Sequence, residues 1–337
     1  MYRMEKFSDF IVEQKEEPYT LLLLVHSTPD DPNKTGVILE KESKKIDGVD
    51  VYQFEVNLGY PTINEKGNMV LHNHVFEKDV MGEIIKEVHD KKGFEIIPDK
   101  TVCMIRGSSE QVYRFADTVR LQDVYTVNSR LTHLLCDDKW LNYVVMKKDG
   151  LNQPKTALIK SERTLDVALK QIGNKFPILL KTAKGTQGIG VIFIESEKSL
   201  IATLQLINKL DENSGVLIQE YIKTDYDARV MVFDNEVVAT LKRPVLKGDF
   251  RSNISQGVEP TKLELTDLER SECIKAAKSV KGKWLGVDFI PSKNRETEKP
   301  YIIEINSSPG TGHINELNNI NIHKIILQHF KNRENWR

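Results

Sequence analysis

The sequence predicts a protein of mixed α/β and α+β class that is built from more than one domain. Near the amino terminus a strand pattern, a helix pattern and another strand pattern follow one another, which favours a small α/β layer. The middle of the chain alternates helix and strand patterns. Two strand patterns, at residues 229–233 and 237–242, flank Asp234 and Asn235 and indicate a hairpin, so a purely parallel sheet is excluded. A length of 337 residues suggests two domains.

Residues 1–130 are expected to form an N-terminal α/β domain. Residues 20–25 are a continuous apolar run and residues 49–56 are rich in β-branched and aromatic side chains, so both are predicted to be strands. We expect a helix over residues 77–92, because its apolar residues share one helical stripe, and a further strand over residues 101–105. The stripe consists of Val80, Met81, Ile84, Ile85 and Val88.

Residues 131–337 are expected to form the second, larger domain. It begins with a helix over residues 137–148, which Asp149 and Gly150 end. Thr266 and Glu269 form a capping box that opens a later helix. The other predicted helices span residues 161–174 and 197–209 and begin at about residue 322. The predicted strands of this domain, besides the hairpin, span residues 178–182, 191–194, 216–220, 284–290 and 300–306.

The composition excludes several classes of partner. Lys and Arg number 48 against 49 Asp and Glu, so no global basic excess exists to hold a nucleic acid or a membrane surface. The longest purely apolar run, residues 21–25, is too short to cross a bilayer, and the first eighteen residues are no secretory signal. Three widely spaced cysteines do not suggest a disulfide framework. We therefore expect a cytoplasmic protein without nucleic-acid or membrane partners.

A glycine-rich turn, residues 184–190, lies between two predicted strands. Small residues in such a turn let backbone N–H groups approach phosphate oxygens closely. Lys181 ends the preceding strand and can place an ammonium group near the same phosphates. The alternative interpretation is a tight hairpin with incidental glycines, and the turn alone does not decide between the two.

Polar residues on the last two predicted strands suggest a metal site. Glu304 and Asn306 alternate with Ile303 and Ile305, so they share one strand face about 7 Å apart. If the two strands pair, Asp288 stands opposite on that face. Hard cations such as Mg²⁺ take oxygen ligands of this kind, completed by phosphate and water. The alternative is a solvated polar face, which the apolar residues on the other side make less attractive.

Arginines cluster around the predicted hairpin and the loop after it. Arg229 lies in the hairpin and Arg243 ends it, while Arg251, Ser252 and Asn253 follow in the loop. Guanidinium groups bind phosphate and carboxylate oxygens in a bidentate manner. Each arginine alone is an ordinary surface charge, but beside the glycine turn and the acidic strand pair they indicate an anion site.

From about residue 97 to residue 312 the sequence resembles the ATP-grasp superfamily, and within it the RimK-type ligases, which include an enzyme that adds glutamates to a ribosomal protein tail. An ordered series of stretches carries this resemblance. They are residues 138–139, 154–156, 178–191 (ILLKTAKGTQGIGV), 219–222, 227–229, 242–243, 250–253, 286–288 and 304–310 (EINSSPG).

The resemblance implies an ATP-grasp fold, with an N-terminal α/β lobe followed by two α+β lobes, about residues 155–222 and 223–337, that clamp the nucleotide. It also implies roles for particular residues. Lys139, Lys181 and the backbone of the turn around Gly188 would contact ATP phosphates. Glu220, Tyr221 and Ile222 would meet the adenine edge, and Asp227 the ribose. Arg251, Ser252 and Asn253 would meet the transferred phosphate, with Arg229 beside them as catalytic groups. Asp288, Glu304 and Asn306 would bind two Mg²⁺ ions, or Mn²⁺, with Glu304 bridging.

The implied function is ATP-dependent ligation of a carboxylate to an amine through an acylphosphate, with glutamate or another amino acid joined to a protein, peptide or small molecule. Two alternatives remain at this stage: a small-molecule kinase of the same fold, and a nucleotide-binding module without catalysis. The family usually has two glycines where this chain has Gly257 and Val258, and the first 95 or so residues carry no motif of the family. Acceptor identity and homo-oligomer formation therefore remain open.

Overall fold

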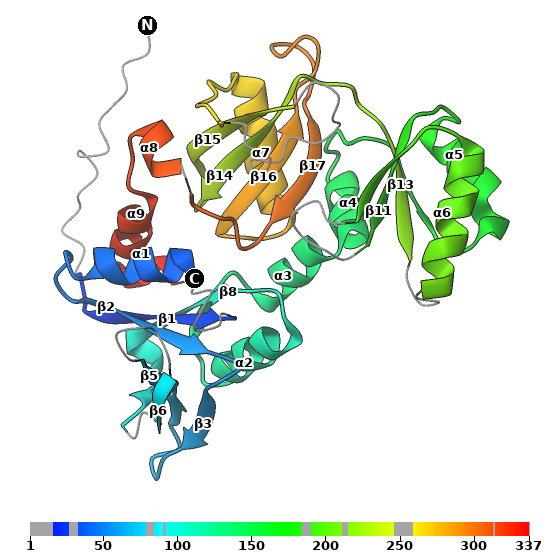
Figure 1. Ribbon diagram of the computed structural model, residues 1–337. Coiled ribbons are helices and arrows are strands. Elements are labelled where there is room, and N and C mark those ends of the chain that lie inside the picture. The colour runs from blue at the N-terminus through cyan, green and yellow to red at the C-terminus, as the bar shows by residue number, and fades with distance from the viewer. Residues whose placement is uncertain are drawn as a thin grey trace, which may run out of the picture. The chain divides into compact units, whose positions relative to one another are not determined.

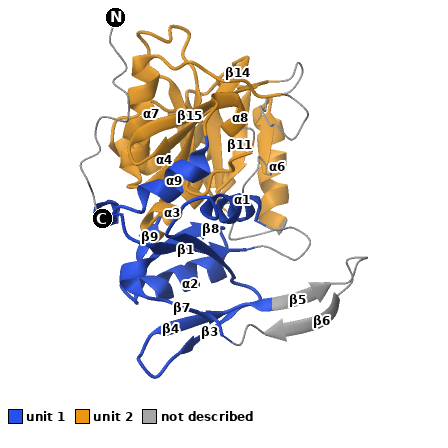
Figure 2. Cartoon of the chain, turned by 90° about the vertical axis from the view of Figure 1, so that its left-hand side faces the viewer, with its two compact units in different colours: residues 1–127, 321–337 blue, residues 128–320 orange. Residues whose placement is uncertain are grey.

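The computed structural model describes residues 16–26, 33–78, 84–89, 92–183, 190–210, 215–245, 259–312 and 314–336. The chain divides into two compact units, shown in different colours in Figure 2. Unit 1 consists of residues 1–127 together with 321–337, and unit 2 of residues 128–320. Among the described helices, none combines the length and the apolar character that crossing a membrane requires.

Unit 1 is built on a parallel sheet in which β1 is central. Its order is β2-β1-β8-β9, formed by Val49–Glu55, Tyr19–Val25, Thr101–Arg106 and Tyr125–Val127. The side chains of residues 21–25 are 0% exposed, because a central parallel strand is covered on both faces. The covering helices are α1 (Lys34–Ser43) and α2 (Glu110–Arg120), whose N-caps are Asn33 and Ser109. The expected strands at residues 20–25, 49–56 and 101–105 are confirmed.

The expected helix over residues 77–92 is wrong. In its place the chain forms β5 (His74–Lys78) and β6 (Ile84–His89), an antiparallel pair in which His74 lies opposite His89. A short apolar stripe suits a strand as well as a helix, and β-branched residues such as Ile84, Ile85 and Val88 favour the strand. A neighbouring three-stranded sheet has the order β3-β4-β7, from Tyr60–Ile63, Met69–His72 and Phe94–Glu95, and a short 3-10 helix follows at Pro98–Lys100.

The C-terminal segment belongs to unit 1, whereas the sequence placed it with residues 131–320. Helix α9 (Ile322–His329) packs against α1, and the hydroxyl of Tyr19 donates a hydrogen bond of 2.7 Å to the carbonyl oxygen of Leu327. Phe330 is 0% exposed and its ring lies 6.2 Å from that of Tyr125. These apolar contacts are made over a long sequence separation, so local patterns do not reveal them.

The first sheet of unit 2 is antiparallel and carries helices on one face. Its order is β10-β13-β11-β12, from Thr156–Ile159, Val216–Glu220, Ile178–Thr182 and Val191–Ile194. Helices α5 (Leu165–Ile172) and α6 (Glu197–Leu210) pack on that face (Figure 1), and a 3-10 turn at Glu162–Thr164 leads into α5. Their contact residues with the strands include Leu169, Leu204 and Ile218. The opposite face carries Lys181.

The second sheet of unit 2 has the order β15-β14-β16-β17. These strands are Glu236–Pro244, Tyr226–Phe233, Trp284–Ile290 and Tyr301–Asn306, all antiparallel to their neighbours. Val230, Val287 and Ile305 point to a core shared with α7 (Asp267–Ser279), which lies behind the sheet in Figure 1. The described part of the unit also contains α3 (Arg130–Asp137), α4 (Lys139–Lys148) and α8 (Ile314–Asn318). The expected hairpin and capping box are confirmed.

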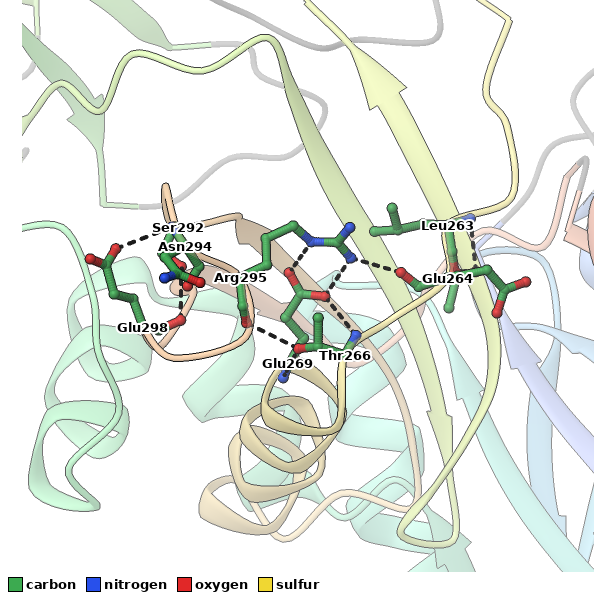
Figure 3. Close-up of polar contacts among 9 residues, drawn as sticks. Leu263, Glu264, Thr266, Glu269, Ser292, Asn294, Arg295 and Glu298 are labelled. Carbon is green, nitrogen blue, oxygen red and sulfur yellow. Dashed lines mark hydrogen bonds and ion pairs between the residues drawn. The ribbon is translucent and has the colours of Figure 1, made fainter. Parts of the chain in front are cut away.

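The connection between β16 and β17 is fastened to the start of α7 (Figure 3). Thr266 and Glu269 exchange the two hydrogen bonds of a capping box. The guanidinium of Arg295, which lies in the connection, donates to both carboxylate oxygens of Glu269 at 2.8 and 2.7 Å and to the carbonyl of Glu264. Glu269 is 1% exposed, so the ion pair satisfies a buried charge. These bonds tie α7 to the connection between β16 and β17, the two strands that carry Asp288 and Glu304.

Candidate functional site

One face of the second sheet in unit 2 carries a row of charged side chains. Cross-strand register places Asp227 opposite Arg243, Arg229 opposite Asp288, and Asp288 opposite Glu304. Asn306 lies opposite Gly286, two residues further along the same face. The other face is the apolar core, and the expected pairing of the two strands is observed. A bulge interrupts the expected alternation, because Ile302 and Ile305 lie in the core while Ile303 has no partner across the register shift.

Two arginines hold Asp288. Arg229 donates to both of its carboxylate oxygens at 2.7 Å, and Arg243 approaches one of them at 3.1 Å. Arg243 also donates to both oxygens of Asp227, at 2.7 and 2.9 Å. Burial by itself raises the pKa of Asp288, which is 5% exposed, but the two guanidinium groups outweigh burial and hold that pKa below its usual value. Asp288 is therefore a carboxylate anion in a buried place.

Among the described residues, Glu304 and Asn306 have fewer hydrogen-bond partners than Asp288. Burial raises the pKa of Glu304, while the cations of Lys139, Lys181 and Arg229 act in the opposite direction. The buried Nδ2 atom of Asn306 has no hydrogen-bond partner among the described residues. A partly buried carboxylate and a partly buried amide in this condition suit a bound ligand. Two carboxylates and one amide also form the oxygen-donor set that Mg²⁺ prefers, so the residues fit that ion. The described residues contain no cluster of three or more His, Cys, Asp or Glu side chains arranged for a metal.

Two asparagine side chains bond to β17 and to the residues next to it. The Oδ1 atom of Asn142, on α4, accepts from the backbone N–H of Ile305 at 3.1 Å. Asn128 donates to the carbonyls of Trp284 and Ser307 at 2.6 and 2.9 Å and accepts from two backbone N–H groups as well. The bond from Asn142 satisfies an N–H group on the outer edge of β17, and Asn128 joins the start of β16 to the residue after β17. They hold the residues on either side of Asn306 in place.

Lys181 lies on the face of the first sheet of unit 2 that is opposite α5 and α6. Its Nζ atom donates to the Oε1 atom of Gln219 at 2.7 Å, and Gln219 in turn donates to Thr156 at 2.8 Å. Burial lowers the pKa of Lys181 to about 8; the Glu304 carboxylate acts to raise it and the Lys139 ammonium to lower it. Lys139, Lys181 and Glu304 are thus close enough to influence one another, although they come from a helix and two different sheets.

Lys139 stands at the beginning of α4. Asp138 caps this helix by accepting from the backbone N–H groups of Trp140 and Leu141 at 2.9 and 3.0 Å. The backbone N–H of Lys139 donates to the carbonyl oxygen of Ala183 at 3.0 Å, which joins the start of α4 to the end of β11. The first turn of a helix carries partial positive charge, which the Asp138 carboxylate meets here.

Glu220, Tyr221 and Ile222 form the end of β13 and the residues after it. The Oε1 atom of Glu220 accepts from the backbone N–H of Lys155 at 2.7 Å, and its own N–H donates to the Lys155 carbonyl at 2.9 Å. The ring of Tyr221 packs edge-on against Phe193, with centroids 5.1 Å apart. Tyr221 and Ile222 are partly buried.

Part of the predicted site lies outside the described residues. This part comprises Gly188, Arg251, Ser252 and Asn253. Asp227, expected beside a ribose, has both carboxylate oxygens engaged by Arg243. The roles that the resemblance implies for Lys139, Lys181, Glu220 and the other site residues stay predictions.

Sequence reasoning missed several residues of this region. Gln219 contacts Lys181 directly, and Thr156 contacts Gln219. Asn142 bonds to β17, and Asn128 bonds to the residue after it. Leu179, Val191 and Phe193 share the face of Lys181 and are only partly buried, which leaves an apolar wall beside it. The strand period of two identifies that wall and Gln219 once β11, β12 and β13 are known to be neighbours. Nothing local identifies the two asparagines.

Comparison with known proteins agrees with this architecture. A model of the RimK-like ATP-grasp domain matches residues 136–330. The chain is 31% identical over 242 residues to a Legionella pneumophila (strain Corby) protein named probable alpha-L-glutamate ligase, which covers 71% of this chain and 77% of that protein.

Solved structures show the same fold over almost the whole chain. The ATP-grasp ligase PsnB, complexed with minimal precursor, Mg and ADP, matches with a TM-score of 0.63 and 16% identity, covering 94% of this chain and 97% of that chain. The macrocyclase MdnC of Microcystis aeruginosa MRC, bound with precursor peptide MdnA, matches with a TM-score of 0.61 and 12% identity, covering 92% and 98%. These similarities confirm the expected ATP-grasp fold. The chain belongs to the RimK-like ATP-grasp family and is an ATP-grasp carboxylate–amine ligase.

Proposed function

We propose that the chain uses ATP to join an amino acid of the glutamate type to a carboxylate on a peptide or protein, with ADP and inorganic phosphate as the other products. The observation that carries the proposal is the row Arg229–Asp288–Glu304 on one sheet, within electrostatic reach of Lys181 and Lys139 from the other lobe. A buried site with acidic groups on one side and cations on the other suits a metal-bound nucleotide. The names of the relatives support glutamate as the amino acid.

In this proposal the ammonium groups of Lys139 and Lys181 offset charge on the ATP phosphates. The partly buried wall of Leu179, Val191 and Phe193 offers an apolar surface to the purine, whose edge meets residues 220–222. Asp288, Glu304 and Asn306 would hold two Mg²⁺ ions, with Glu304 shared, and the ions would neutralise phosphate charge as it shifts during transfer. Arg229, with Arg251, Ser252 and Asn253 in the loop, steadies the transferred phosphoryl group.

The substrate carboxylate attacks the γ-phosphorus of ATP, ADP leaves, and an acylphosphate forms. The amine then attacks the acyl carbon, phosphate leaves with the C–O electron pair, and an amide remains. The acylphosphate is an anhydride, so the amine must reach it before water does. A peptide or protein acceptor is supported by the precursor peptides bound to PsnB and MdnC. Three buried, free cysteines are compatible with a reducing cytoplasm.

The test is incubation of the protein with Mg-ATP, a panel of amino acids and a panel of acidic peptides, with ADP, phosphate and peptide mass as readouts. We expect phosphate release that depends on both an amino acid and a peptide, and a mass increase equal to one or more added residues. Hydroxylamine in place of the amino acid should trap the acylphosphate as a hydroxamate. Glu304→Gln is the matched negative control.

Three results would contradict the proposal. A phosphorylated product without phosphate release would indicate a kinase. Release of AMP and pyrophosphate would indicate adenylation. Nucleotide binding without turnover across the whole panel, together with no hydroxamate, would indicate a binding module.

A further inference from the structure

Lys181 does not project freely from its strand, because a second side chain holds it. The Nζ atom of Lys181 donates to the Oε1 atom of Gln219 at 2.7 Å, across the β11–β13 pair. The neighbouring strand β10 supplies Thr156, whose Oγ1 atom accepts from the Nε2 atom of Gln219 at 2.8 Å. Gln219 is 7% exposed and Thr156 1% exposed, so water does not compete strongly for these bonds.

The direction of these bonds is determined at Thr156. Its hydroxyl donates its only proton to the carbonyl oxygen of Pro154 at 3.0 Å. The hydroxyl oxygen can therefore only accept from Gln219, which requires the Nε2 side of the amide to face Thr156. The Oε1 side must then face Lys181. A flipped amide would bring two donors together at Lys181 and two acceptors together at Thr156.

We propose that Gln219 is a positioning residue for Lys181, and that Thr156 sets the orientation of the Gln219 amide. The inference rests on the proposed function, in which Lys181 contacts the phosphates of ATP. An ammonium group has three N–H donors; the amide oxygen takes one and directs the other two toward the nucleotide. A flexible four-carbon stem that is held at its tip loses less freedom when the phosphates bind.

A neutral amide suits this task better than a carboxylate. A glutamate at position 219 would pair with Lys181 as an ion pair and compete with the phosphates for the same charge. The amide oxygen orients the ammonium while its charge remains available. One carboxylate already acts on Lys181, that of Glu304 on the second sheet of unit 2, and the ammonium of Lys139 opposes its effect on the pKa of Lys181.

The test is a double-mutant cycle on ATP affinity, measured by calorimetry with Mg-ATP on the full chain. The variants are Gln219→Met, which keeps the shape of the side chain, Lys181→Met, and both together. We expect Gln219→Met to weaken ATP binding about tenfold, which is the loss of one oriented hydrogen bond to a charged group. In the Lys181→Met background the same change should alter ATP affinity by less than about twofold, because the group that it positions is gone.

Two further variants separate positioning from a general role in the fold. Thr156→Val removes the hydroxyl that orients the amide and should weaken ATP binding about threefold in wild type, with no effect beside Lys181→Met. Gln171, on α5, is the matched control, since its Nε2 atom donates to the backbone carbonyl of Thr156 without contacting Lys181. Gln171→Met should leave ATP affinity unchanged.

Equal losses from Gln219→Met in the two backgrounds would overturn the inference, because they would show that Gln219 acts through the fold. Wild-type ATP affinity in both Gln219→Met and Thr156→Val would overturn it as well. These results leave the proposed function intact, because wild type still binds ATP. A wild-type protein that binds no Mg-ATP would overturn the proposed function together with the inference.

Discussion

Lys181→Met should separate nucleotide binding from folding stability. The variant keeps most of the apolar stem and removes the ammonium group. Loss of a charge-assisted contact with a phosphate costs about 1.5–3 kcal/mol, which is about 10- to 150-fold in ATP affinity. In the protein without ATP the same ammonium group destabilises the folded state, because burial disfavours its charge and lowers its pKa from 10.5 to about 8.

The effect on stability has a definite dependence on pH. The folded state binds the Lys181 proton less tightly than the unfolded state, so the penalty is fully present below pH 8 and fades as pH rises toward 10.5. Lowering a pKa from 10.5 to about 8 corresponds to about 3 kcal/mol at pH 7. Part of this penalty persists at pH 10, so the penalty changes by at most about 2.5 kcal/mol between pH 7 and pH 10. The measured change should be smaller, because water screens a partly exposed side chain.

Removing the ammonium group also leaves the buried Oε1 atom of Gln219 without its donor, at a cost of about 1–3 kcal/mol at either pH. This cost cancels when the two pH values are compared. The free energy of unfolding of Lys181→Met, measured relative to wild type by urea titration, should therefore be higher at pH 7 than at pH 10. Lys147→Met, on the exposed end of α4, is the matched control. An identical difference at the two pH values would refute the reasoning.

Three further predictions concern other parts of the molecule. Glu304→Gln should lower ATP turnover more than 100-fold, because a shared metal ligand needs its full charge; this corresponds to a rise of about 3 kcal/mol or more in the activation free energy. Near-normal activity at saturating Mg²⁺ would show that Glu304 is not a metal ligand. Arg295→Met should lower the free energy of unfolding by about 2–3 kcal/mol, since Glu269 is 1% exposed and loses two charged hydrogen bonds. Lys44→Met breaks an ion pair with Glu40 in which the two side chains are 73% and 45% exposed, so it should lower the free energy of unfolding by less than about 1 kcal/mol. Equal effects of Arg295→Met and Lys44→Met in urea would contradict this ranking. Burial lowers the pKa of His323 to about 4, so between pH 6.5 and pH 4 the unfolded chain binds a proton at this residue that the folded chain does not. The free energy of unfolding should therefore fall by up to about 3 kcal/mol over this range. An equal fall in a His323→Asn variant would show that other groups cause it.

Local residue patterns were enough to predict much of unit 2. Residues 178–182, 191–194, 216–220 and 284–290 are strands with the predicted bounds, because alternation and β-branched composition are properties of a few adjacent residues. The capping box at Thr266 is likewise local. The same reasoning failed over residues 77–92, where the described part is a strand pair, because spacing alone does not distinguish a short amphipathic helix from two short strands.

By itself, the sequence determined which residues share a face. The period of two placed Glu304 and Asn306 together and predicted that Asp288 would meet them if the strands paired. The motif series was also sufficient to identify the family, because the order of the motifs along the chain can be read without knowing which residues are in contact.

The tertiary structure alone decided which groups satisfy these side chains. The two arginines that hold Asp288, the asparagines that fasten β17, and the packing of α9 in unit 1 all join residues far apart in the chain. The link from Lys181 through Gln219 to Thr156 crosses three strands that are not consecutive in sequence. Such contacts depend on strand order, which is selected by burial of the whole core, and no local pattern records that choice.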